Sequence, residues 1–279
     1  MLTLSLLVSC GGGGDDGTPP LKITGSTTVN PPVAEAADQL RQSKGWTIYV
    51  DTQGGSSGGV SSVGEGRAQI GMASRPLEEK DSTKFPDVEF VTTSIGSDAL
   101  AIVVAKDVWD GGLTALTKAQ IRSIYEGIAT NWSELGGPDQ EIVFFNKEPG
   151  RGTWEVFAKW LYDGDADAAP PVSHPEVGAN EEARTKVGST RGAISQLSAA
   201  WADGETVFAL TVDGVAPTPE KIAAGEYPIS RPLNLITNGV PMGEAAEFID
   251  FMLGAEGQKL VASHGYLPIR GAAAPASAE

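Results

Sequence analysis

The chain has 279 residues, of which 41% are hydrophobic, and this is enough for a large core and for more than one domain. Its formal net charge of −16 repels nucleic acid and anionic lipid headgroups, so we expect neither as a partner. One cysteine and two histidines exclude an intrachain disulfide and argue against a thiolate or imidazole metal cluster, and we expect no cofactor.

The amino terminus has the pattern of a bacterial export signal with a lipid-attachment site. Residues 1–9 form a short apolar run, and residues 7–10 (Leu-Val-Ser-Cys) have the shape of a lipobox ending in Cys10. The run is too short to span a bilayer. The stretch Gly11–Gly17 indicates a flexible tether, which disfavours the alternative of a buried strand that ends in cysteine. We therefore predict that residues 1–20 are signal and tether, and that Cys10 carries a lipid that anchors the protein to a membrane without spanning it.

Short strands and helices alternate along the body of the chain. Apolar alternation and continuous apolar runs predict strands at residues 21–24, 46–51, 68–73, 88–95, 100–105, 141–145 and 233–237. Helical periodicity and end signals predict helices at residues 31–44, 60–67, 117–125, 153–162, 243–253 and 256–263. Thr117, with Gln120 three residues later, has the pattern of a capping box. This alternation predicts an α/β protein with mainly parallel sheets, a proline-rich loop at 170–179 and a disordered tail at 271–279.

Three predicted strands are each followed by a corner rich in glycine, serine or threonine, and then by a helix. The corners are Gly25–Val29, Gln53–Gly59 and Lys147–Thr153. A helix start leaves backbone N–H groups without partners, and the helix dipole makes that end partly positive. Glycine lets the backbone approach a ligand closely, and hydroxyl groups add donors. Any one corner is compatible with ordinary helix capping, but three together indicate that an acidic protein holds an anion by local dipoles.

In this order, the corners resemble those of the phosphate-binding proteins of bacterial phosphate ABC transporters. Residues 25–28 (GSTT) match the family's opening motif, residues 55–60 (GSSGGV) its second segment, and residues 71–75 (GMASR) a segment of one branch. The third corner corresponds to the family's phosphate loop. Shorter matches follow at residues 130–138, 214–218, 227–233 and 248–259, so that the resemblance covers about residues 21–270.

The resemblance implies an α/β fold of the periplasmic binding protein type II class, in which two lobes close over a ligand cleft. It implies chain crossings near Ala105 and Arg231, with residues 21–104 and 232–270 in the first lobe and residues 105–231 in the second. It also implies a monomeric lipoprotein of the periplasm or cell surface, not an enzyme, that delivers inorganic phosphate to a membrane permease. The residues that it assigns to phosphate are Ser26, Thr27, Thr28, Val29, Ser56, Ser57, Ser74, Arg75, Lys147, Gly150, Arg151, Gly152 and Thr153.

Some of these positions depart from the family's usual pattern. Lys147 stands where arginine is usual, and lysine lacks the bidentate fork that suits phosphate. Arg151 stands where serine is usual and would restore a guanidinium from four residues away, unless it is only a surface cation. Ser74 falls where one branch has an aspartate that accepts the phosphate's proton. The departures leave the selectivity among oxyanions open.

Rival interpretations follow from the same residues. Arg75 fits the branch without the aspartate, or else forms a salt bridge to Glu78 or Glu79. Without a carboxylate acceptor, sulfate, molybdate or tungstate is an alternative ligand. An exported phosphate-ester hydrolase would need a positioned base, and both His174 and His264 are expected at the surface, away from any nucleophile. A phosphate sensor without a transporter partner has the same sequence features.

Overall fold

The computed structural model describes residues 19–165 and 168–269, so the predicted signal, Cys10 and the tail at 271–279 lie outside the described residues. The strands are β1 (Leu21–Gly25), β2 (Ile48–Asp51), β3 (Ile70–Ala73), β4 (Phe90–Ala105), β5 (Ala115–Leu116), β6 (Val143–Lys147), β7 (Glu176–Val177), β8 (Ala193–Ser198), β9 (Val207–Ala209), β10 (Thr211–Val212), β11 (Ser230–Asn238) and β12 (Leu267–Pro268). The helices are α1 (Asn30–Lys44), α2 (Gly55–Gly64), α3 (Glu79–Lys84), α4 (Lys106–Asp110), α5 (Lys118–Tyr125), α6 (Gly152–Leu161), α7 (Asn180–Ser189), α8 (Pro219–Ala223), α9 (Gly243–Leu253) and α10 (Ala255–Ser263), with 3-10 turns η1 (Trp132–Leu135) and η2 (Ala199–Trp201). Among these, no helix combines the length and apolarity that crossing a membrane requires.

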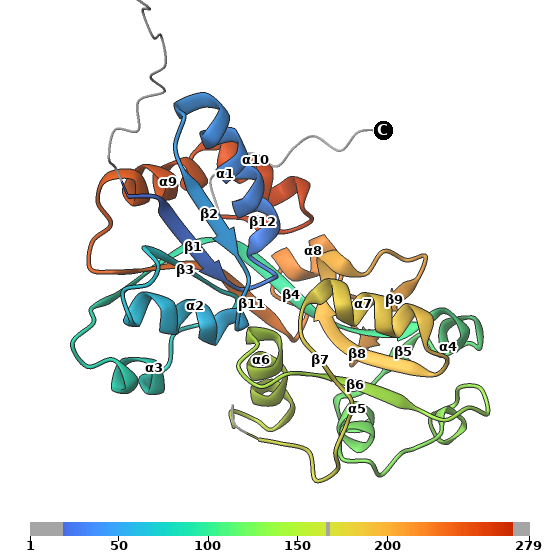
Figure 1. Ribbon diagram of the computed structural model, residues 1–279. Helices are drawn as coiled ribbons and strands as arrows, with labels where there is room; N and C mark the ends of the chain where they lie inside the picture. Colours follow the sequence, from blue (N-terminus) through green and yellow to red (C-terminus); the bar gives the residue numbers. More distant parts are fainter. Residues whose placement is uncertain (1–18, 166–167, 270–279) are drawn as a thin grey trace, which may run out of the picture.

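The main sheet has strand order β2-β1-β3-β11-β4-β8-β6-β7, and β9 and β12 also pair with β4 (Figure 1). The strands β1, β2 and β3 are parallel to one another, and so are β6, β7 and β8. Between these groups β4 and β11 run antiparallel to each other and to β8 and β3. The prediction of mainly parallel sheets is therefore wrong. The sheet is mixed because β4 carries the chain from one half of the molecule to the other and β11 carries it back.

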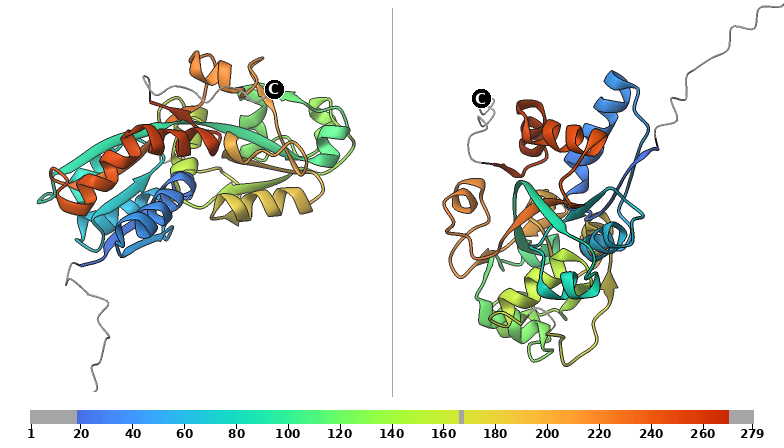
Figure 2. Two further views of the ribbon diagram at one scale, coloured as in Figure 1. Left: turned by 90° about the horizontal axis from the view of Figure 1, so that it is seen from above. Right: turned by 90° about the vertical axis from the view of Figure 1, so that its left-hand side faces the viewer.

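The long strand β4 belongs to both halves of the molecule, as the view from above shows (Figure 2). Its residues 90–99 pair with β11, and residues 100–104 pair with β8. The passage between halves thus falls near Ala99, a few residues before the predicted crossing at Ala105, and β11 begins at Ser230, beside the predicted return. The predicted division into two lobes stays a prediction, because it concerns bodies that move independently.

Each half has its own apolar core. In the first half, α1, α9 and α10 pack on one face of the sheet around Ile23, Phe248 and Val261, and α2 covers the other face (Figure 1). In the second half, α5 and α6 pack with β4, β6 and β8 on one side, and α7 covers the other. Because helices cover both faces of the main sheet in each half, the strand ends that point toward the other half are held in place. Those ends carry the corners singled out from the sequence.

Candidate anion-binding site

The three corners meet between the two halves of the molecule, at the starts of α1, α2 and α6. Together they line a cavity of about 10 Å³, which is roughly the space of one water molecule. A tetrahedral anion is larger than this, so its entry requires the two sides to move apart. The lining residues are Ser26, Thr27, Thr28, Gly55, Ser56, Ser74, Lys147, Arg151, Gly152, Thr153, Gly178 and Asn180.

A chain of serine hydroxyls joins the first two corners. Ser26 Oγ accepts from the backbone N–H groups of Thr28 and Val29, at 3.2 and 3.4 Å, and donates to Ser74 Oγ at 2.9 Å. Ser56 Oγ accepts from the N–H of Ser74 at 3.1 Å. Val29 is buried but is not among the cavity-lining residues. The network fixes these hydroxyls at the cavity wall, so no side-chain entropy is lost there when a ligand binds.

Gly25 lets the first corner approach the sheet. Its φ of 132° lies in a region that other residues rarely adopt, and a Cβ there would come within 2.3 Å of the Met72 carbonyl oxygen. Ser26 N donates to that same carbonyl at 2.9 Å. The glycine therefore places Ser26 directly beside β3, within reach of Ser74.

Two cations line the opposite wall. Lys147 is 1% exposed, and its Nζ donates to the carbonyl oxygens of Gly178 and Ala179, at 3.0 and 2.9 Å. Burial, together with the nearby charge of Arg151 and of the buried Arg231, lowers the pKa of Lys147 to about 7. Arg151 pairs with Glu148, with Nη2 and Oε2 at 2.8 Å. The wall can therefore present one permanent positive charge and one that depends on pH.

Arg231 is a residue of the site that the sequence did not indicate as one. Its side chain is fully buried, and Nε and Nη2 donate to Asp98 Oδ2 at 3.0 and 2.8 Å. Nη1 donates to Thr153 Oγ1 at 2.8 Å, and Nη2 donates to Thr28 Oγ1 at 3.2 Å. The guanidinium thus connects the two crossing strands, β4 and β11, to a lining hydroxyl from each half. Because each hydroxyl accepts from Arg231, its own hydrogen is left for another acceptor.

Asn180 is a second residue that sequence reasoning missed. It is the first residue of α7, directly after the corner Gly178-Ala179, and its Nδ2 donates to Thr28 Oγ1 at 3.0 Å. The sequence predicted a proline-rich loop for residues 170–179, but the structure has the short strand β7 within this stretch, and α7 begins directly after it. The signal that could have found Asn180 is the same strand–corner–helix pattern as in the other three corners, but the strand β7 has only two residues.

Besides Val29, three predicted phosphate ligands, Ser57, Arg75 and Gly150, are not among the residues that line the cavity. Arg75 is 1% exposed and pairs with Asp81 through two nitrogens at 2.6 and 2.9 Å, and its Nε lies 2.7 Å from Glu155 Oε2. Ser57 Oγ donates to Glu155 Oε1 at 3.0 Å, and its N–H donates to the carbonyl of Gly150 at 3.1 Å. These contacts join the first half to the second. Glu78 and Glu79 were the expected alternative partners of Arg75. In the structure the buried carboxylates of Asp81 and Glu155 take that place.

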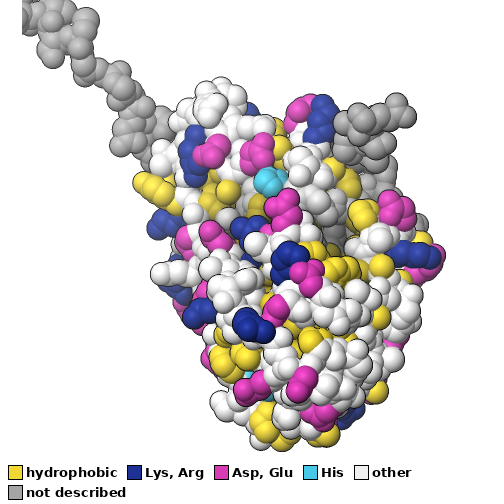
Figure 3. Space-filling view, turned by 90° about the vertical axis from the view of Figure 1, so that its right-hand side faces the viewer, with side chains coloured by type: hydrophobic (Ala, Val, Ile, Leu, Met, Phe, Trp, Pro, Cys, Tyr) yellow, Lys and Arg dark blue, Asp and Glu magenta, His cyan; other side chains and the backbone are white. Residues whose placement is uncertain are grey.

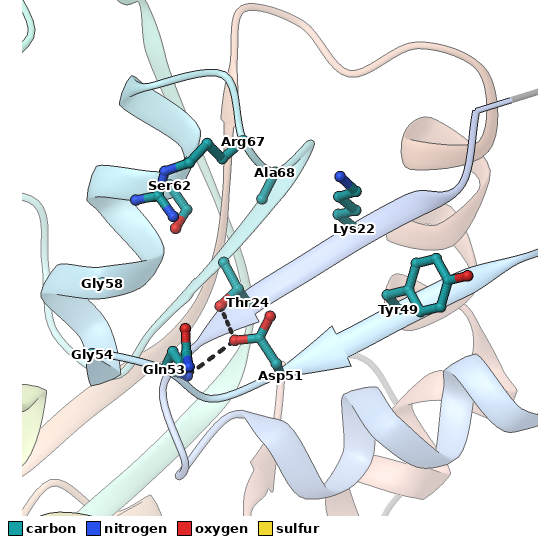
Figure 4. Close-up of a pocket in the computed structure, with 10 residues that line it drawn as sticks. All are labelled: Lys22, Thr24, Tyr49, Asp51, Gln53, Gly54, Gly58, Ser62, Arg67 and Ala68. Carbon is teal, nitrogen blue, oxygen red and sulfur yellow. Dashed lines mark hydrogen bonds between the residues drawn. The ribbon is translucent and has the colours of Figure 1, made fainter.

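A larger cavity, of about 450 Å³, lies beside β1, β2 and α2 (Figure 4). Lys22 and Arg67 line this cavity, and so does Asp51. The carboxylate of Asp51 accepts from the hydroxyl of Thr24 and from the N–H of Gln53. That carboxylate would repel an anion, so this cavity is a poorer candidate than the one between the halves. On the face shown in Figure 3, cationic and acidic side chains are interspersed, which gives an anion no long-range attraction to that face.

Comparisons with known proteins assign the chain to a family. The PBP superfamily domain matches residues 12–256. The phosphate-binding protein PstS of Bacillus subtilis is 32% identical over 250 residues, which make up 89% of this chain and 80% of that protein. A protein of Clostridium perfringens, solved with bound phosphate, is 30% identical with a TM-score of 0.81 over 90% of this chain and 100% of its own. An ABC-type phosphate transport receptor of Vibrio cholerae is 30% identical with a TM-score of 0.70, over 88% of this chain and 99% of its own.

These likenesses confirm the predicted α/β fold of the periplasmic binding protein class. They also place the chain among binding proteins and not among enzymes. The chain belongs to the PBP superfamily and, within it, to the phosphate-binding proteins of phosphate ABC transporters.

Proposed function

We propose that this protein captures inorganic phosphate outside the cytoplasm and delivers it to the membrane permease of an ABC importer. The observation that carries the proposal is the cavity between the halves, where helix starts, hydroxyls and the cations Lys147 and Arg151 converge. Within the part of the chain that the structure describes, neither a carboxylate nor a histidine lines this cavity. Such a set of donors suits a multivalent anion and lacks the base that ester hydrolysis would need.

The proposed ligands come from both halves. Ser26, Thr28, Ser56 and Ser74 act from the first half, and Lys147, Arg151 and the N–H groups that begin α6 act from the second. About ten hydrogen bonds to a charged ligand, at roughly 1.5–3 kcal/mol each, would exceed the ~8 kcal/mol of a micromolar complex. Desolvation of the dianion and closure of the two halves consume the rest. In this proposal Arg75 and Ser57 contribute by holding the halves together.

Calorimetry tests the proposal directly. We expect the whole chain to bind phosphate with one site per molecule and an affinity in the micromolar range or tighter. No heat at millimolar phosphate would end the proposal, and preferential binding of sulfate, molybdate or tungstate would redirect it to another oxyanion. A chromogenic phosphate ester should not be hydrolysed.

We further propose that the protein acts as a monomeric lipoprotein, anchored through Cys10 in the periplasm or at the cell surface. The lipobox-like residues 7–10 and the glycine-rich stretch that follows support this. Membrane fractionation of the chain with and without Cys10 tests the anchor. The proposal of a lipid anchor is refuted if both forms are found in the soluble fraction.

Lys147 makes a prediction about protons. Since its pKa is lowered to about 7, most of the free protein carries a neutral lysine at pH 8. A bound dianion favours the ammonium form, so phosphate binding at pH 8 should take up close to one proton, and affinity should fall as the pH rises above 7. Calorimetry in buffers of different ionisation enthalpy measures this uptake. In Lys147→Arg, whose guanidinium stays protonated, the uptake should disappear, and an equal uptake in both proteins would refute the assignment.

A further inference from the structure

We propose that Asn180 Oδ1 accepts the hydrogen of monohydrogen phosphate and thereby lets the site reject tetrahedral dianions that carry no hydrogen. The inference rests on the proposed function and deepens it, since it names the residue that determines which oxyanion is bound. In one branch of the family an aspartate accepts the phosphate's proton, and in this chain Ser74 stands at that position. The inference names the group that accepts the proton in its place.

The amide of Asn180 is held in place by one of its two polar atoms. The side chain lines the cavity and the residue is 1% exposed, and Nδ2 donates to Thr28 Oγ1 at 3.0 Å. Oδ1 is buried and has no hydrogen-bond partner among the described residues. A buried carbonyl oxygen without a partner is destabilising and uncommon in native proteins, so its place in a ligand cavity points to a partner that the ligand supplies.

Several polar groups near Asn180 have acceptor lone pairs that are already engaged. Thr28 Oγ1 accepts from both Asn180 Nδ2 and Arg231 Nη2, which leaves its hydrogen to donate. The carbonyl oxygens of Gly178 and Ala179 already accept from Lys147 Nζ. Thus Asn180 Oδ1 is a buried acceptor without a partner among the described residues, and it lies beside donors that any oxyanion oxygen can use.

The ligand that fits this arrangement is a tetrahedral anion with one hydroxyl group. Monohydrogen phosphate, abundant at neutral pH, has three oxygens that only accept and one that can donate to Oδ1. Sulfate has the same charge and shape but would direct lone pairs at Oδ1, leaving that oxygen unpaired and repelled. Sites that hydrogen-bond a hydroxyl discriminate strongly against analogues that lack it, because a buried polar group is then left unpaired.

Competition among three anions tests the inference on the whole chain. The probes are phosphate, sulfate and monofluorophosphate, which is a dianion of the same shape with fluorine in place of the hydroxyl. For the unaltered protein we expect phosphate to bind at least about 100-fold more tightly than the other two. In Asn180→Leu, which has no acceptor, that ratio should fall about tenfold or more. Asn180→Asp, which restores an acceptor oxygen, should recover the preference and shows that the position tolerates change.

Thr27→Val is the matched control, since it removes a hydroxyl of the same cavity and should leave the ratio between the anions unchanged. The inference is overturned if Asn180→Leu weakens all three anions equally, the result expected when Nδ2 and not Oδ1 faces the ligand. It is also overturned if the unaltered protein binds sulfate or monofluorophosphate as tightly as phosphate. Failure of the unaltered protein to bind any of the three would instead refute the proposed function.

Discussion

In an Arg231→Met variant we expect two losses, one of stability and one of phosphate binding. The free energy of unfolding at neutral pH should fall by about 3–5 kcal/mol, because Asp98, which is 3% exposed, would lose the partner that compensates the burial of its carboxylate and would have to take up a proton instead. Phosphate affinity should fall about 100-fold or more, since two lining hydroxyls lose the contacts that orient them. Thermal unfolding and calorimetry measure the two effects separately.

The loss of binding follows from the position of the guanidinium. Arg231 donates to Thr28 in the first half and to Thr153 in the second, at 3.2 and 2.8 Å. With Arg231 removed, these hydroxyls can turn their lone pairs toward the cavity, where an anion requires a donor. The halves also lose a link that spans them when they are closed. The effect on binding should therefore be larger than that of removing one hydroxyl.

A double variant separates stability from binding. Burial raises the pKa of Asp98, while the charge of Arg231 opposes that shift. Without Arg231 the native state should keep a proton on Asp98 that the unfolded chain releases above pH ~4, so the single variant should lose stability as the pH rises. Adding Asp98→Asn removes the ionisable carboxyl and should restore most of the stability without restoring affinity. Recovery of affinity in the double variant would show that Arg231 has only a structural role.

Local signals in the sequence predicted the elements that build most of the site. The capping box of Thr117 and Gln120 is confirmed at the start of α5, and α1, α6 and α9 lie within a residue or two of their predicted bounds. The three corners could be found because a strand end, a run of small residues and a helix start are all encoded within about ten residues. The elements of the fold that depend on such short segments were therefore predictable.

The helix α2 shows where propensity misled. We predicted a helix at residues 60–67, but the helix begins at Gly55 and ends at Gly64, although glycine and serine disfavour helical structure. One of its glycines is required by close packing on the sheet. A Cβ on Gly59 would come within 2.7 Å of the Met72 carbonyl oxygen in β3 and within 3.0 Å of the Thr24 carbonyl oxygen in β1. Tertiary contact, which no local window contains, decided the conformation.

The parts that were not predictable depend on distant residues. Arg231 and Asp98 are 133 positions apart, and although Arg231 lies in the matching stretch at 227–233, nothing local indicates that it pairs with Asp98. Two strands were predicted, at 88–95 and 100–105, yet β4 continues from Phe90 to Ala105 because Arg231 and Ser198 satisfy the buried carboxylate of Asp98. The strand β8 was missed for a related reason. Its Gln196 and Ser198 are polar but buried, and their partners Asn146 and Asp98 lie far along the chain.

For Gly152→Ala we expect phosphate affinity to fall about 10- to 100-fold while the melting temperature stays nearly unchanged. A Cβ at this position would lie 2.4 Å from Ser56 Oγ and 2.7 Å from Ser74 Oγ, so the first half could no longer close against α6. Losing the contacts of one or two hydroxyls with the anion accounts for the size of the effect. Gly152 begins α6 and has no left-handed backbone conformation, so alanine does not disfavour the helix itself.

The expected split between binding and stability is what makes Gly152→Ala informative about closure. Calorimetry measures the affinity, and small-angle X-ray scattering with saturating phosphate should show a larger radius of gyration than for the unaltered protein, because the halves stay apart. Gly188→Ala is the matched control in the same half. A Cβ on Gly188 would lie 3.3 Å from the side chain of Thr206, a contact that needs only a small adjustment. The Gly188→Ala variant should therefore bind phosphate with unchanged affinity. If Gly152→Ala binds phosphate as tightly as the unaltered protein, the close approach of Ser56 and Ser74 to α6 does not belong to the phosphate-bound state.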